Sequence, residues 1–235
     1  LIYEVELRLK GADNMSGTGG IEVRQARLIS VNSWGIIVAG KTTELPGHFT
    51  DLYGVFATFQ NGGAGLFNQG KRTSGLLAYK STFSKNAFIV LAVASLAKDD
   101  NFADAKAARG VYKLGDISVG AGVIIIDKAI TGETDDTVQK SAVVAYKANG
   151  IHASVNYEQV DDLDARIGVA AGYTMGKINA KAGLISHGDD TNIIAHASYM
   201  IAKKASSKLK AFVELENHSA NESKNKLSLG LSNKF

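Results

Sequence analysis

The sequence contains no cysteine and a single proline, Pro46, in 235 residues. Without cysteine the chain can form no disulfide, no thiolate metal site and no thiol nucleophile. It also lacks a long apolar run, since the longest extends only from Ala87 to Ala94. A helix needs about 20 apolar residues to span a bilayer. The sequence therefore excludes a helical membrane protein.

Charge of one sign is not in excess either. The 26 basic and 23 acidic residues give a net charge of +3, and the basic ones are scattered along the chain. A protein that binds nucleic acid more often gathers its basic residues on one face. We therefore expect no nucleic-acid partner.

The sequence contains no strong metal-binding, phosphate-binding or catalytic motif. The five histidines show no metal-ligand spacing, and the glycine-rich run at 62–70 lacks the Gly-Lys-Ser/Thr ending of a phosphate loop. Acidic loop stretches such as 133–136 are interpreted as solvated rather than as calcium ligands. His187 with Asp189 or Asp190 is the nearest approach to a catalytic pair. We expect no metal, no cofactor, no catalytic residue and no enzymatic activity.

The dominant pattern is an alternation of apolar and polar residues with period two, which indicates strands with one apolar face. Leu227, Leu229 and Leu231, for example, are separated by small or polar residues, and Val213 and Leu215 alternate with acidic ones. The pattern predicts about fourteen strands of roughly nine to twelve residues, close to the length of a tilted strand that crosses a membrane.

Connections between these strands are predicted to alternate strictly between short and long. The short turns are expected at 83–86, 115–116, 149–150, 176–177 and 204–206. The longer loops are expected near 99–103, 128–137, 160–163, 186–191 and 218–223. Asn149-Gly150 is the strongest of these signals, because both residues tolerate the positive φ of a two-residue hairpin. Strict alternation would place all tight turns at one end of the structure.

Strand length and loop asymmetry favour a barrel in a bilayer over a soluble sandwich. In a membrane barrel the apolar residues face lipid, the polar ones line a wet lumen, and the sheet closes so that every backbone group is paired. Tyrosines near strand ends then form a girdle at the membrane interface. The candidates for this girdle are Tyr3, Tyr79, Tyr157, Tyr173 and Tyr199.

One stretch, Lys41 to Lys80, is too long for an ordinary connection between two strands. It contains Pro46, the run Gly62-Gly63-Ala64-Gly65 and many apolar anchors, so disorder is not expected. A long ordered loop of this kind has to fold against another part of the molecule.

From Val23 onward the residues resemble the general diffusion porins of Gram-negative outer membranes, the trimeric sixteen-stranded type. The resemblance is carried by Val23-Arg24-Gln25-Ala26, by Gly40-Lys41, by Leu52-Tyr53-Gly54, by Gly62 to Leu66 and by Arg72 to Lys80. The last strand, ending in Phe235, is similar to the outer-membrane assembly signal.

The resemblance implies one all-β domain over 1–235, a transmembrane antiparallel β-barrel with about fourteen of the family's sixteen strands. A constriction loop at about 42–72 would fold into its lumen. The segment 1–10 resembles the family's third strand. Either the sequence begins after a first hairpin, or the barrel closes with about fourteen strands.

Carried over residue by residue, the resemblance also implies a pore constriction. Lys41, Lys80 and Arg72 fall at basic wall or loop positions, and Glu44 and Asp51 are the acids of the loop. Either Arg24 or Arg27 also faces the lumen.

The implied function is an outer-membrane channel for passive diffusion of small hydrophilic solutes and ions. The implied partners are these solutes, the lipid bilayer, lipopolysaccharide and two further copies in a homotrimer. The alternative is a substrate-specific channel, for oligosaccharides for example, because aromatic residues occur along the loop at Phe49, Tyr53, Phe56 and Phe59.

Overall fold

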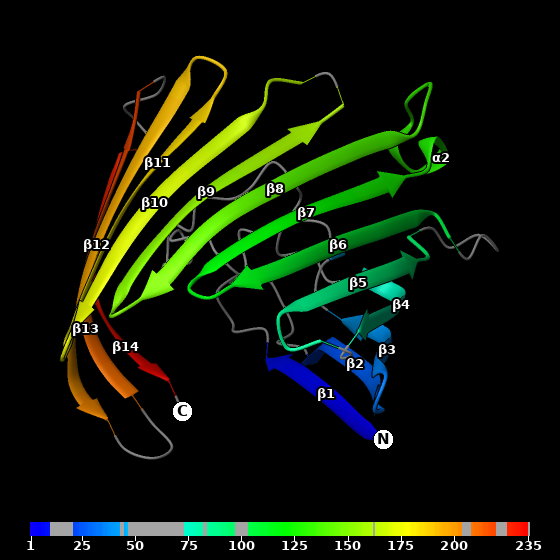
Figure 1. Ribbon diagram of the computed structural model, residues 1–235, viewed down its shortest axis with the longest axis horizontal. Helices are drawn as coiled ribbons and strands as arrows, with labels where there is room; N and C mark the ends of the chain where they lie inside the picture. The colour runs from blue at the N-terminus through cyan, green and yellow to red at the C-terminus, as the bar shows by residue number, and fades with distance from the viewer. Residues whose placement is uncertain are drawn as a thin grey trace. The chain divides into compact units, whose positions relative to one another are not determined.

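The computed structural model describes residues 1–9, 21–42, 45–46, 73–81, 84–96, 103–161, 163–203, 208–219 and 225–234. These residues form fourteen strands, hydrogen-bonded to one another in chain order, and one short helix (Figure 1). In this part of the chain no helix has the length and apolar composition needed to cross a bilayer. The all-β class and the expected number of strands are confirmed.

By its internal contacts the chain divides into two compact units. The first comprises 1–47, 68–111 and 122–139, and the second comprises 48–67, 112–121 and 140–235. The first seven strands are β1 (Ile2–Leu9), β2 (Ile21–Val31), β3 (Gly35–Thr42), β4 (Thr73–Ser81), β5 (Ala87–Ala94), β6 (Ala105–Leu114) and β7 (Ile117–Ile126). Helix α2 (Lys128–Thr131) follows, then β8 (Thr137–Ala148), β9 (Ile151–Val160), β10 (Arg166–Met175), β11 (Ile178–His187), β12 (Asp190–Lys203), β13 (Lys208–His218) and β14 (Lys226–Lys234).

The expected short turn at Asn149-Gly150 joins β8 to β9. Both residues have positive φ, 50° at Asn149 and 80° at Gly150, as the tightest hairpins require. The backbone N–H of Thr174 donates to the Gly150 carbonyl at 2.8 Å, which ties the turn to β10. The turn prediction is confirmed.

The prediction of a longer loop at 186–191 is wrong. Strand β11 ends at His187 and β12 begins at Asp190, so only Gly188 and Asp189 connect them. Gly188 has φ 56°, which permits a two-residue hairpin within a sequence whose polar composition suggested a loop. Short and long connections therefore do not alternate strictly along the chain.

The two faces of the strands differ sharply in burial. On β13, Glu214 is 0% exposed whereas its neighbour Leu215 is 50% exposed. On β14, Leu229 is 73% exposed. We call the side that carries Glu214 and Glu216 in the second unit, and Leu76, Ala92 and Ala94 in the first, the buried face.

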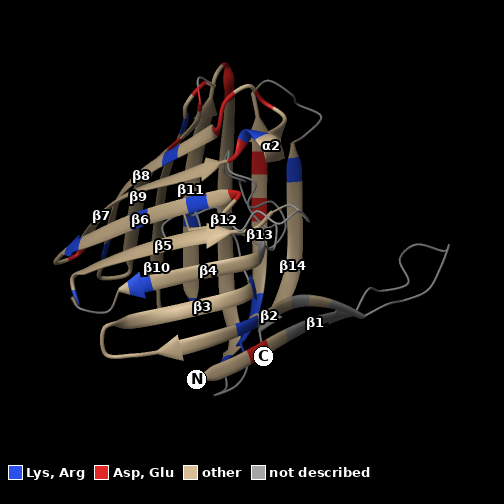
Figure 2. Ribbon diagram, turned by 90° about the vertical axis from the view of Figure 1, so that its right-hand side faces the viewer, with Lys and Arg blue, Asp and Glu red and all other residues tan. Residues whose placement is uncertain are grey.

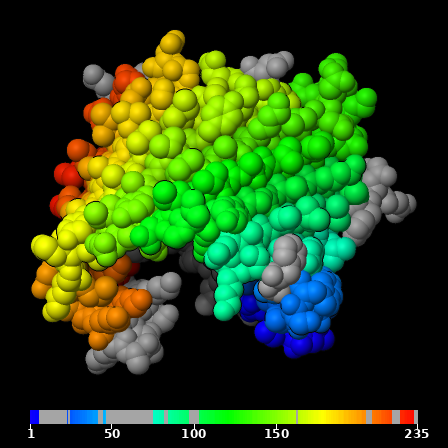
Figure 3. Space-filling view, in the orientation of Figure 1, coloured from blue at the N-terminus to red at the C-terminus, as the bar shows by residue number. Residues whose placement is uncertain are grey.

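The opposite side is the exposed face, and it is apolar in both units. In the second unit it presents Val155, Ile167, Val169, Ile193, Val213, Leu215, Leu227, Leu229 and Leu231, and in the first unit Leu28, Leu77, Ile89 and Leu91. In Figure 3, which is coloured by residue number, the surface over β8–β10 appears in green to yellow. The predicted inversion is confirmed in the second unit, where aliphatic side chains lie on the exposed face and Glu158, Glu214 and Glu216 on the buried face. In the first unit the exposed face is aliphatic as well, but the buried face also carries apolar residues such as Leu76 and Ala94.

Tyrosines recur at one position near the ends of alternate strands. Tyr79, Tyr112, Tyr146 and Tyr173 each lie two residues before the last residue of β4, β6, β8 and β10. Three of them, Tyr112, Tyr146 and Tyr173, are exposed. Tyr3 and Tyr199 are exposed as predicted, and Tyr157 is half-buried. Tyr112 and Tyr146 are not among the predicted girdle residues, although they lie at the same distance from their strand ends as Tyr79 and Tyr173.

The turn between β2 and β3 depends on a close approach at Gly35. The Tyr79 ring lies over Gly35, and its hydroxyl donates to the Trp34 carbonyl at 2.8 Å, with the two ring centroids 5.6 Å apart. A Cβ at position 35 would overlap the Tyr79 ring.

We therefore expect Gly35→Ala to lower the free energy of unfolding by about 1–3 kcal/mol, the usual cost of overpacking. Urea titration followed by the fluorescence of Trp34, the only tryptophan, would measure it. The control is Gly110→Ala, because a Cβ there would come no closer than 4.0 Å to the Phe88 carbonyl oxygen. Equal losses in the two variants would contradict the assignment.

Candidate functional site

Polar and charged side chains concentrate on the buried face of the second unit. They come from β9, β10, β12 and β13, four strands of the sheet whose register is regular across β9–β11. On these four strands the members below one-tenth exposure are Ser154, Asn156, Glu158, Arg166, Asn192, His196, Ser198, Glu214 and Glu216. Such groups are stable away from bulk water only when they are hydrogen-bonded or paired.

Glu158 and Arg166 form an ion pair across β9 and β10. The two residues are direct cross-strand partners, and Arg166 Nη1 donates to Glu158 Oε2 at 3.3 Å. Their side chains are 1% and 4% exposed. Arg166 Nη2 is buried without a hydrogen-bond partner in the described part of the chain. The ion pair therefore holds a positive and a negative charge side by side on the buried face.

A second network joins β12 to β13. Glu216 Oε1 accepts a hydrogen bond from Asn192 Nδ2 at 2.8 Å and lies 3.0 Å from His218 Nε2. Two residues earlier on β13, Glu214 Oε2 lies 3.2 Å from His196 Nδ1. Each carboxylate of β13 therefore has a partner on β12 or on its own strand.

The strand register aligns charges of both signs in one row across the buried face. Lys181 on β11 faces His196, His196 faces Glu214, and Glu214 faces Ser228 on β14. Since neighbouring strands lie about 4.8 Å apart, the row passes from a cation to an anion over two strand spacings. Figure 2 shows the acidic positions of β13 in red. Fixed charges in this order produce an electric field directed across the strands.

Three of the predicted constriction residues have described side chains, all in the first unit. Arg27 pairs with Glu4 across β1 and β2, at 2.9 Å from Nη2 to Oε2. Lys80 is exposed, with its Nζ 4.6 Å from the centroid of the Phe88 ring. Lys41 faces Ala26 in the register, and its Nζ donates to the Val23 carbonyl at 2.9 Å.

The register brings two of these side chains to the same face. Arg27 faces Gly40, and Gly40 faces Leu76, which is buried. Lys80 follows Leu76 by four residues on β4 and therefore shares its face. Lys41 follows Gly40 directly, so its side chain leaves the strand on the opposite face. The register between β3 and β4 shifts at this point. The role of these residues in a constriction stays a prediction.

The other predicted site residues lie outside the described residues. Glu44, Asp51 and Arg72 belong to this group, as do the four loop aromatics and Phe235. The backbone of Arg24 is part of β2, but its side chain is not described. In the described ranges no three His, Cys, Asp or Glu side chains gather in a way that could hold a metal ion.

No protein-family model and no curated protein matches the sequence. Solved structures do match. The Salmonella typhi OmpF complex with daunomycin has a TM-score of 0.71 at 15% identity, covering 91% of this chain and 78% of that chain. The anion-selective porin from Comamonas acidovorans has a TM-score of 0.64 at 12% identity, covering 98% and 80%.

The chain has the porin fold. A further match is a loop-deletion mutant of OmpT, an outer membrane protein of Vibrio cholerae, with a TM-score of 0.68, 17% identity and coverage of 99% and 84%. The predicted fold class is confirmed by these outer-membrane structures. At such low identity the likeness extends to the porin fold and not to individual residues.

Proposed function

We propose that the protein forms a water-filled channel in the outer membrane of a Gram-negative bacterium. Small hydrophilic solutes and ions would cross it by passive diffusion, without any chemical reaction. The observation that carries the proposal is the inversion of burial, with Glu214 fully buried and its neighbour Leu215 half exposed on the same strand. A soluble β protein would bury the leucine instead.

Bilayer physics explains this distribution. Hydrocarbon accepts the aliphatic exposed face at no cost, whereas each unpaired backbone group in lipid costs several kcal/mol, so strands that span a membrane have to close on one another. The buried face would then look toward the lumen. Glu158, Glu214 and Glu216, together with the Arg166 guanidinium that pairs with Glu158, would then give this wall charges of both signs.

Selectivity would follow the charges at the narrowest point. We assign this point to the loop at about 42–72, with Lys41, Lys80 and Arg72 against Glu44 and Asp51, and with Arg24 or Arg27 on the wall. Since bases outnumber acids in this set, the channel should prefer anions weakly. On the buried face, the Arg166 guanidinium offsets the charge of Glu158.

The partners proposed are the bilayer, lipopolysaccharide and two further copies of the chain. One of the structural neighbours, in-vitro folded OmpT of Vibrio cholerae, was solved in a trimer form. A homotrimer of this chain is proposed by that analogy. Chemical cross-linking of the folded protein would measure the oligomeric state.

Single-channel conductance of the refolded protein in a planar bilayer tests the channel itself. Stepwise ohmic conductance is the expected result, and folded protein without conductance would refute the proposal. Block of the current by a sugar, saturating with concentration, would favour the oligosaccharide-specific alternative. Its aromatic candidates lie in the undescribed part of the loop.

Ion selectivity gives a sharper prediction at Lys80. Its exposed ammonium contributes a positive charge on the buried face, so Lys80→Glu should shift the reversal potential in a salt gradient toward cation preference. The matched control is Lys85→Glu, an identical charge change at an exposed position in the β4–β5 turn. Equal shifts in the two variants, or strong cation preference of the unchanged protein, would contradict the assignment.

A further inference from the structure

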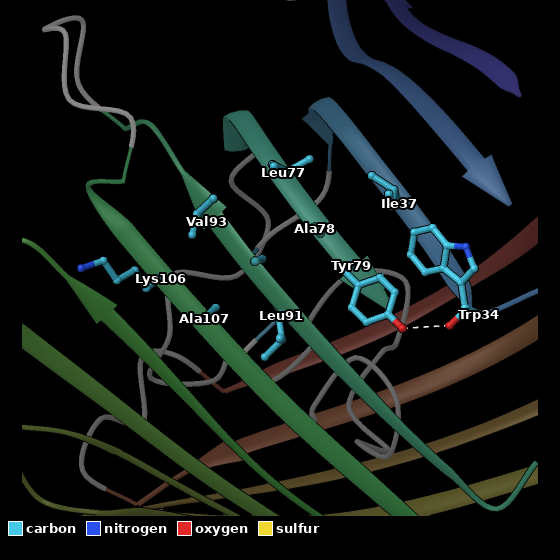
Figure 4. Close-up of a pocket in the computed structure, with 10 residues that line it drawn as sticks. Trp34, Ile37, Leu77, Ala78, Tyr79, Leu91, Val93, Lys106 and Ala107 are labelled. Atoms are coloured by element: carbon cyan, nitrogen blue, oxygen red, sulfur yellow. Dashed lines mark hydrogen bonds between the residues drawn. The ribbon is translucent and has the colours of Figure 1, made fainter. Parts of the chain in front are cut away.

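The exposed face of the first unit carries a groove of about 530 Å³ on β3–β6. Its lining is apolar, with Leu77, Leu91 and Val93 along the floor and the Trp34 and Tyr79 rings at one end (Figure 4). Lys106 lies at its edge and is the one charged residue among the described residues that line it. The groove thus combines a long apolar surface with a single positive charge.

Lys106 is placed on the exposed face by its own strand. Its neighbours on β6, Ala105 and Ala107, are 0% and 6% exposed, so alternation turns the lysine to the other side. The side chain is exposed, and no carboxylate pairs with it among the described residues. On a face that meets lipid, an ammonium group without a counter-ion is costly.

We propose that this groove binds one acyl chain of an anionic membrane lipid whose phosphate headgroup contacts Lys106. This inference rests on the proposed function, because it requires the exposed face to lie in a bilayer. The apolar floor matches an acyl chain, and the ammonium matches a phosphate as a compact point charge. The flexible stem of lysine lets its charged end reach the headgroup region while its methylene groups stay on apolar surface.

A second copy of the chain fits the groove less well. Covering it with protein would remove the Lys106 ammonium from both water and lipid headgroups, and a buried charge without a partner strongly opposes association. A lipid brings the opposite charge on the same molecule as the apolar chain. The combination of the two features in one groove therefore favours the lipid.

Trp34 provides the probe, because it lines the groove and the protein contains no other tryptophan. The protein is refolded into phosphatidylcholine vesicles containing a minor amount of phosphatidylglycerol. Bromine atoms, which quench tryptophan, are carried on the acyl chains of either the anionic or the zwitterionic lipid at equal molar amount. We expect a roughly fivefold enrichment of the anionic lipid at Trp34, equivalent to the about 1 kcal/mol that one basic residue gives at an anionic surface.

Lys106→Gln should abolish this preference, and Lys106→Arg should retain it. The matched control is Lys113→Gln, the same substitution at an exposed lysine near the other end of β6, which should leave the preference unchanged. Retention of the preference in Lys106→Gln would overturn the assignment, as would equal quenching by the two lipids in the unchanged protein.

Channel conductance measured on the same vesicles separates the two proposals. Conducting protein whose Trp34 is quenched by neither lipid would mean that another copy covers the groove, which overturns the lipid proposal alone. Folded protein that neither conducts nor shows quenching would overturn the proposed function as well. Conducting protein with the expected preference supports both.

Discussion

Leu229→Lys is expected to lower the free energy of unfolding in lipid vesicles by about 2–4 kcal/mol, the cost of a lysine on the lipid face near the bilayer midplane. Leu229 lies near the middle of β14 and is 73% exposed. In a soluble protein, a lysine at such an exposed position would change stability by less than about 0.5 kcal/mol. Urea titration of the vesicle-bound protein, followed by Trp34 fluorescence, measures the loss.

Ser228→Lys is the matched control, because it places the same side chain one residue away on the opposite face. Ser228 is the cross-strand partner of Glu214, so the new ammonium would lie beside a carboxylate. We expect a much smaller change than in Leu229→Lys. The reverse order, with Ser228→Lys the more damaging variant, would mean that the apolar face is not the lipid face.

Glu158→Gln should lower the free energy of unfolding by about 3–5 kcal/mol, because it leaves the Arg166 guanidinium buried without its counter-charge. The pair is 3.3 Å apart and both side chains are almost fully buried. Arg166→Met should have a comparable effect, because it leaves the Glu158 carboxylate buried without its counter-charge.

The double variant Glu158→Gln with Arg166→Met distinguishes a buried pair from two independent losses. Removing both charges together removes the unpaired ion, so the double variant should lose far less than the sum of the single losses. The same urea titration measures the full cycle. Additive single losses, or two single variants as stable as the unchanged protein, would show that water screens this pair.

Which residues of a strand lie on its apolar side could be predicted from the sequence, because alternation is a local property. Val213 and Leu215 were placed on the apolar side and Glu214 and Glu216 on the polar side from the spacing alone, and the structure agrees. The Asn149-Gly150 turn was predictable for the same reason, since its two residues by themselves favour the required backbone conformation.

Pairing between strands was not predictable, because register depends on several connections at once. Alternation along the sequence is enough to place Glu158 and Arg166 on polar faces, but their contact follows from the length of the β9–β10 loop and from the register of both strands. The same holds for His196 and Glu214, which come together through the β12–β13 pairing. The resemblance implied site residues only in and beside the loop, and none on β9–β13.

If the protein lies in a membrane as proposed, the tyrosines two residues from the ends of β4, β6, β8 and β10 would set its depth there. Interfacial rings resist displacement toward either the hydrocarbon or the water. Rings at the same distance from the ends of alternate strands would mark one margin of the hydrophobic belt. The opposite margin would then absorb any change in membrane thickness.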